Sequence, residues 1–191
     1  MDRLGEKIGI IAMLITAFSL GSSPHPFVLI LCYLIHELGH ITMAKLVKAQ
    51  MKSFKVGTLH LSISYDCSNL SYGRELLVLL GGILFNLISA FFVSFLGFGG
   101  ETCEFFVVGN ISLAIMNLYP ISILDGGGIL KTLASMIWSR DVAEKLSKIT
   151  SFICAILMWI IAVYFQIVFV SNFSLFLISV VLLVELCFTY L

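Results

Sequence analysis

The sequence is poor in charged residues, which fill 12% of its 191 positions, and it has only three prolines. Hydrophobic residues fill 60% of the positions, whereas soluble globular domains usually have roughly 45–50%. Eleven basic residues balance eleven acidic ones, so there is no excess positive charge that would bind a nucleic acid. The composition predicts an integral membrane protein with no nucleic-acid partner.

Cysteines are few and scattered, and no two of them form a C-x-x-C pair. An odd number cannot form a complete set of disulfides. We therefore expect reduced thiols that pack as small apolar side chains. They are Cys32, Cys67, Cys103, Cys154 and Cys187.

Six apolar runs approach the roughly 20 residues that a helix needs to cross a bilayer. They lie at residues 8–23, 26–45, 76–98, 105–124, 150–170 and 173–190. The first run is short enough for a signal peptide, but no A-x-A cleavage site follows it, and we interpret it as a span. We expect an all-α polytopic membrane protein of about six transmembrane helices. Residues 1–191 form one domain, with a core at 26–130 and accessory spans at 8–23, 150–170 and 173–190.

Two patterns mark the loops between these runs. Basic residues are confined to alternate loops, which predicts that the termini and the basic loops are cytoplasmic. In the long basic loop after the second run, apolar and polar residues alternate from Leu59 to Asp66, and this period predicts a small β-hairpin or sheet. The basic residues are Arg3 and Lys7, then Lys45, Lys48, Lys52, Lys55 and Arg74, then Lys131, Arg140, Lys145 and Lys148.

The second run contains an H-E-x-x-H motif, from His36 through Glu37 to His40. Residues four apart share a helix face, so both imidazoles can bind one zinc ion while Glu37 faces the position left for water. Each ionisable group inside a span costs on the order of 3 kcal/mol, and metal coordination would offset that cost. The alternative is a polar cluster that joins helices by hydrogen bonds.

A catalytic zinc usually has a third protein ligand. Asp125 is favoured because it lies between Pro120, which ends a helix, and the glycines at 126–128, which permit irregular backbone. Irregular backbone at membrane depth must be covered by protein or line a water-filled cavity. Glu75 stands beside a basic residue at a membrane edge and fits a surface charge, and His60 fits the solvated face of a strand. The candidates are thus Asp125, Glu75 and His60, and Asp125 is favoured over the other two.

These motifs together resemble the site-2 protease family of intramembrane metalloproteases, peptidase family M50. The matching segments are His36–His40, Asn117-Leu118-Tyr119-Pro120-Ile121-Ser122-Ile123-Leu124-Asp125-Gly126-Gly127, and Gly81-Gly82-Ile83-Leu84-Phe85-Asn86. The resemblance is strongest to the sporulation factor IVB type. It implies that His36, His40 and Asp125 bind one Zn²⁺ per chain, that Glu37 is the general base, and that Asn86 and Asn117 lie near the substrate.

The residues alone leave the two asparagines open. Asn86 stands with Gly82 and Ala90 at four-residue spacing, a stripe of small residues that lets helices approach closely. Packing and substrate contact are equally good interpretations of Asn86. Asn117 fits hydrogen bonding at a helix kink slightly better than substrate contact.

The resemblance also implies a function and its setting. The substrate would be a membrane-embedded or membrane-tethered protein, such as a transcription factor precursor cut during sporulation, at a site within the bilayer near the cytoplasmic face. Membrane-protein regulators and self-association are compatible with it. Ile83, Ile123 and Gly128 depart from the family pattern, and the nucleotide-binding domain of the sporulation-type enzymes does not follow the last run.

A metal transporter or metal sensor is the main rival to a hydrolase. Such a protein would use the same ligands without hydrolysis, but it has no need for Glu37 at the second place of the motif. The sequence also shows no internal repeat that would relate two halves of the chain, as is common in transporters. A catalytically inactive scaffold is a weaker rival because every predicted ligand is intact.

Overall fold

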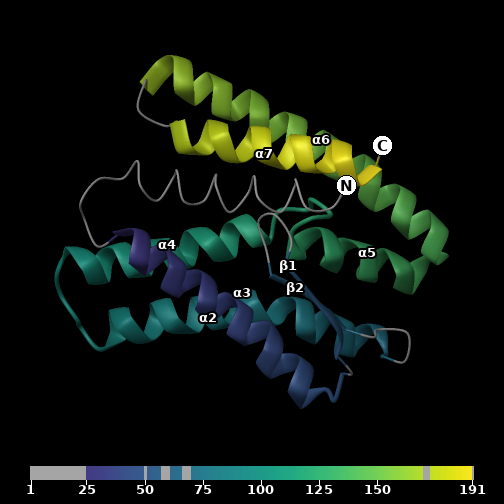
Figure 1. Cartoon of the computed structure of the whole chain (residues 1–191), viewed down its shortest axis with the longest axis horizontal. Coiled ribbons are helices and arrows are strands. Elements are labelled where there is room, and N and C mark those ends of the chain that lie inside the picture. Colours follow the sequence, from purple (N-terminus) through teal and green to yellow (C-terminus); the bar gives the residue numbers. More distant parts are fainter. Residues whose placement is uncertain (1–24, 50, 57–60, 66–69, 170–172, 191) are drawn as a thin grey trace.

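The computed structural model describes residues 25–49, 51–56, 61–65, 70–169 and 173–190. These residues form six helices and two strands (Figure 1). The predicted run at 8–23 lies outside them. The helices are α2 (His25–Leu46), α3 (Tyr72–Phe95), α4 (Glu101–Asn117), α5 (Asp125–Ile137), α6 (Arg140–Phe169) and α7 (Phe173–Tyr190).

Helices α2, α3 and α4 pack against one another and form the first layer (Figure 1). Two glycines set the close crossing of α2 and α3. A Cβ atom on Gly81 would lie 2.7 Å from the carbonyl oxygen of Gly39. Small residues at such a crossing let two backbones touch, which is a common way to join helices in a membrane. The crossing fixes the motif helix against α3.

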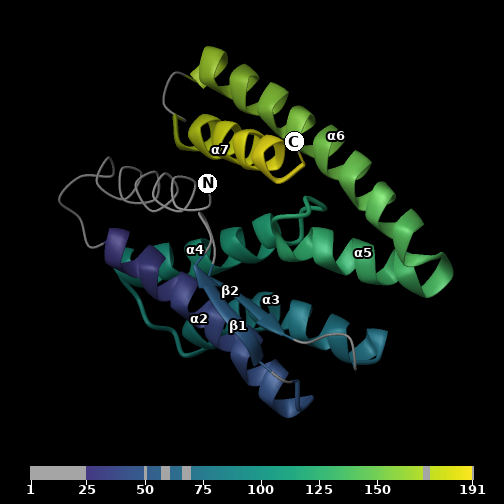
Figure 2. The ribbon, with the colours of Figure 1, turned by 45° about the vertical axis from the view of Figure 1, so that its right-hand side comes forward.

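Helices α6 and α7 form a second layer, which Figure 2 shows side by side and apart from α2 and α3. They enclose a core of four fully buried residues, Ile121, Ala155, Leu182 and Leu186. Ile121 belongs to the irregular segment between α4 and α5, so the second layer packs directly on that segment. Helix α5 contacts both α3 and α6 and links the two layers.

Three of the described helices are long and apolar enough to cross a membrane, namely Phe27–Leu46 in α2, Tyr72–Phe95 (all of α3) and Arg140–Val168 in α6. Helix α4 has 17 residues, and the apolar part of α7, Phe176–Tyr190, is also short. Three of the six expected spans thus meet the length of a membrane helix. Large apolar side chains on these helices face outward, with Phe27 77% and Phe95 74% exposed, as lipid-facing positions require.

Two predicted boundaries are wrong. The run at 105–124 is not one helix, because α4 ends at Asn117, where Pro120 lacks an N–H and restricts the residue before it. The run at 150–170 belongs to a longer helix that begins at Arg140. Its first turns are charged, but lysine, glutamate and alanine are good helix formers.

The loop between α2 and α3 contains two antiparallel strands, β1 (Met51–Val56) and β2 (Leu61–Tyr65). Lys55 pairs with Ser62 and Val56 with Leu61. Strand β2 falls inside the alternating segment from Leu59 to Asp66. The two strands lie beside the helices of the first layer (Figures 1 and 2).

Candidate metal centre

Three side chains from two helices converge at one point. His36 and His40 lie one turn apart on α2, and Asp125 is the first residue of α5. Asp125 Oδ2 lies 3.0 Å from His36 Nε2 and 3.2 Å from His40 Nε2. The two Nε2 atoms are 3.1 Å apart. The cluster is largely buried, since the Asp125 side chain is 17% exposed and the histidine side chains less.

The spacing of these three atoms fits a tetrahedral metal ion. When the bonds to the ion are about 2.0–2.1 Å long, two ligand atoms of a tetrahedron lie about 3.3 Å apart. The observed separations of 3.0–3.2 Å are close to this value. Two imidazole nitrogens and one carboxylate oxygen are also a donor set that suits zinc. The cluster can therefore hold one metal ion and leave a fourth position open.

His40 is oriented by a backbone contact from the neighbouring helix. Its Nδ1 lies 2.8 Å from the carbonyl oxygen of Val78 on α3. Nδ1–H must donate this hydrogen bond, which leaves Nε2 with the lone pair that a metal needs. Like His40, His36 has its Nε2 atom directed toward Asp125. Its buried Nδ1 has no hydrogen-bond partner among the described residues.

Gly82 on α3 packs directly against both imidazole rings. A Cβ atom at this position would lie 2.5 Å from His36 Cε1 and 2.5 Å from His40 Nε2. Any side chain would therefore occupy the space that the two rings need. The absence of a side chain at Gly82 is a condition for the cluster.

The segment from Leu118 to Leu124 presents Asp125 to the motif helix. After α4 ends, the Ser122 N–H donates a hydrogen bond of 2.8 Å to Ser151 Oγ on α6. Gly126 and Gly127 pack so tightly on the carbonyls of Leu118 and Ile121 that neither position has room for a Cβ atom. The glycines after the aspartate thus allow α5 to start against this irregular backbone.

Glu37 lies next to the cluster and is 7% exposed. It interacts electrostatically with His36, His40 and Asp125, and the Tyr33 hydroxyl one turn earlier donates a hydrogen bond to its carboxyl group. A buried carboxyl group beside a metal position is placed to accept a proton from a water at that position.

Comparisons with known proteins bear on the fold. The structure superposes on the site-2 protease from Methanocaldococcus jannaschii with a TM-score of 0.68 and 20% sequence identity, over 94% of this chain and 86% of that chain. The fold is that of a site-2 protease. A model of peptidase family M50 matches residues 100–161. This match contains Asp125 but not the H-E-x-x-H motif. No curated protein matches the sequence significantly.

The other predicted residues lie around this site-2 protease fold in different ways. Asn86 is fully buried on α3, and neither of its amide atoms has a partner within the described part of the chain. Asn117 donates its amide N–H to the Leu113 carbonyl on its own helix, at 3.0 Å. Glu75 lies in the first turn of α3 and is not part of the cluster. His60 lies outside the described residues.

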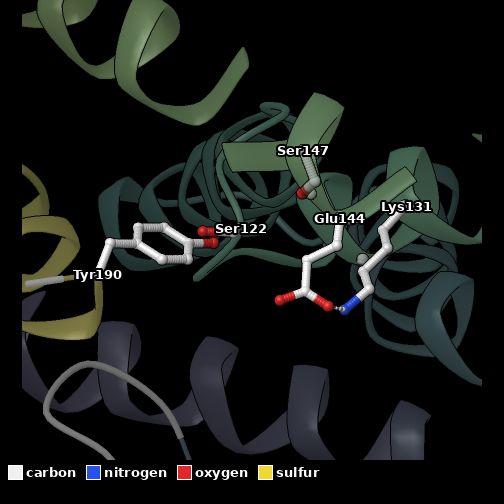
Figure 3. A pocket seen from close by; sticks show the side chains of 7 residues that line it. Ser122, Lys131, Glu144, Ser147 and Tyr190 are labelled. Atoms are coloured by element: carbon white, nitrogen blue, oxygen red, sulfur yellow. Dashed lines mark hydrogen bonds and ion pairs between the residues drawn. The ribbon is translucent and has the colours of Figure 1, made fainter. Parts of the chain in front are cut away.

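Residues of α5, α6, α7 and the segment before α5 line a cavity of about 240 Å³ (Figure 3). At its edge Lys131 Nζ and Glu144 Oε2 are 3.5 Å apart. None of the predicted site residues lines the cavity, so it is distinct from the metal cluster. Its lining consists of Ser122, Gly127, Gly128, Lys131, Glu144, Ser147 and Tyr190.

Sequence reasoning missed two polar residues close to the cluster. Cys32 and Asn110 are fully buried, and Asn110 Nδ2 donates to Cys32 Sγ at 3.0 Å. A signal was present in the sequence, because Cys32 is four residues before His36 and Asn110 is an amide inside an apolar helix. Polar residues at such positions usually face protein rather than lipid.

Proposed function

We propose that this protein is an intramembrane zinc metalloprotease. One observation carries the proposal: His36, His40 and Asp125 meet at 3.0–3.2 Å, with buried Glu37 beside them. The helix that holds the two histidines and Glu37 is apolar enough to cross a membrane. The shared fold with a site-2 protease and the partial match to peptidase family M50 support it.

The chain's own residues suit peptide hydrolysis. His36, His40 and Asp125 would hold the ion, which when bound would polarise the scissile carbonyl and acidify a water molecule. Glu37 then accepts the proton of the attacking water and returns it to the leaving amine. A transporter or sensor has no use for this proton carrier.

The substrate that we propose is a membrane-embedded or membrane-tethered protein, such as a transcription factor precursor. The cluster joins side chains of α2 and α5 and is largely buried, so a scissile bond must reach it inside the helix assembly. A helical substrate hides its carbonyl groups in its own hydrogen bonds. It must therefore unwind locally before it reaches Glu37.

The first test replaces the proton carrier. Glu37→Gln keeps the size and removes the base, so we expect unchanged zinc content and loss of cleavage of a set of tagged single-span membrane proteins. Glu75→Gln is the matched control, since Glu75 is a carboxylate outside the cluster, and it should cleave at the wild-type rate. Cleavage by Glu37→Gln at the wild-type rate would remove Glu37 from the mechanism.

The second test concerns the third ligand. Asp125→Ala should lower zinc content, because two imidazoles alone hold the ion less firmly than three ligands. Asp141→Ala is the control, since Asp141 is an exposed aspartate in the first turn of α6. Full zinc content in Asp125→Ala would exclude Asp125 as a ligand. Zinc binding without cleavage of any substrate would favour transport or sensing.

A further inference from the structure

Four buried polar atoms near the cluster have no hydrogen-bond partner in the described part of the chain. They are His36 Nδ1, Asn86 Oδ1, Asn86 Nδ2 and Asn110 Oδ1. Both asparagines are 0% exposed and His36 is 4% exposed. Buried polar groups in folded proteins nearly always have partners, and a buried water often supplies them. Several such atoms together therefore indicate that something polar binds between them.

The contacts between helices indicate that these residues lie at a similar level of the helix assembly. Gly82 packs against His36, and Asn86 stands one turn later on the same face of α3. Cys32 stands one turn before His36 on α2, and Asn110 on α4 contacts it. Helices α3 and α4 are joined by a short turn and pack together, and Asn86 and Asn110 are equally far from that turn.

The Asn110 amide is fixed by its two donor contacts. Its Nδ2 donates to the Phe106 carbonyl at 2.9 Å and to Cys32 Sγ at 3.0 Å. Both amide hydrogens are thereby used. Oδ1 remains as a free acceptor on the same side chain, and its orientation cannot change without breaking both contacts.

We propose that Asn86 and Asn110 hold an ordered water that orients His36. When His36 Nε2 binds the metal, Nδ1 carries the hydrogen and donates it to this water. The water in turn donates its two hydrogens to Asn86 Oδ1 and Asn110 Oδ1. Three such bonds are typical of a buried water. The inference rests on the metal site of the proposed function.

This water would be the counterpart of the Val78 carbonyl, which orients His40. Metal-bound histidines almost always donate their second ring N–H to a carboxylate, carbonyl or water, and loss of that partner usually weakens metal binding about 10- to 100-fold. Asn86 and Asn110 would thus be positioning residues. A purely structural role predicts a different effect, because Asn110 would then only join α4 to α2 through Cys32.

The test measures the zinc dissociation constant of the full chain by competition with a chelator, and the thermal stability of the zinc-free protein in parallel. Asn86→Leu and Asn110→Leu remove the acceptors, so each should weaken zinc binding about tenfold or more. Asn86→Ser keeps an acceptor and leaves room for another water, so it should bind zinc nearly as well as the wild type. Ser179→Ala on α7 alters a buried hydroxyl remote from the site and should not change the affinity.

Two results would overturn the inference. One is wild-type zinc affinity in both leucine variants, with only their stability lowered. The other is a wild-type structure that shows ordered waters but none at His36 Nδ1, which decides the matter even if the leucine variants do not fold. Failure of the wild type to bind zinc would instead refute the proposed function, so the two failures are distinguishable.

Discussion

At the scale of single residues, Gly82 is the position where the smallest change should have the largest effect. In Gly82→Ala the new methyl group would meet both imidazoles, and overpacking of this kind costs about 1–3 kcal/mol. We expect lower zinc content per chain and a lower melting temperature. Gly73→Ala is the control, because a Cβ atom there meets nothing within 4 Å. Normal zinc content in Gly82→Ala would show that the rings can shift without losing the ion.

The spacing of His36 and His40 was predictable because it is local, since any helix places residues four apart on one face. Asp125 was recognisable from the proline before it and the glycines after it. The contacts of His40 with Val78 and of Asn110 with Cys32 were not predictable. They depend on which faces of α2, α3 and α4 meet, and the apolar pattern of these helices does not encode that choice.

At the scale of elements, α6 holds the segment that presents Asp125. Ser151→Ala would leave the Ser122 N–H without its acceptor, at a cost of about 1–3 kcal/mol. We expect a lower melting temperature and faster loss of zinc to a chelator. Ser135→Ala is the control, since Ser135 is half-buried and its hydroxyl bonds only to its own helix. Equal zinc loss in the two variants would mean that α6 does not support the ligand segment.

Helix boundaries show where sequence patterns fail. Apolar residues continue from Leu118 to Leu124, although the backbone leaves the helix at Asn117. Hydropathy reports the apolar content of a run and not its backbone conformation. Conversely, α6 begins at Arg140. Its first turns are charged, so hydropathy does not detect them, although they are continuous with the helix of the apolar run. The existence of both helices was predictable. The end of α4 depends on Pro120, and the start of α6 depends on packing against α5.

At the scale of the whole molecule, the distribution of basic residues predicts which ends of the helices face the cytoplasm. Single cysteines introduced at Ser53 and Ser139 should react with a membrane-impermeant thiol reagent only from the cytoplasmic side. A cysteine at Thr102, in the exposed first turn of α4, should react only from the opposite side. Labelling of the unaltered chain gives the background of the native cysteines. Reaction of positions 53 and 102 from the same side would contradict this topology.

We propose that zinc held by His36, His40 and Asp125 hydrolyses a peptide bond within the membrane. The most direct test places the purified chain and a single-span substrate in lipid vesicles, removes zinc with a chelator, restores it, and locates the cut by mass spectrometry. We expect cleavage to stop without zinc, to return with zinc, and to occur within the membrane segment of the substrate. Cleavage that persists after zinc removal, or a cut confined to residues outside that segment, would contradict it.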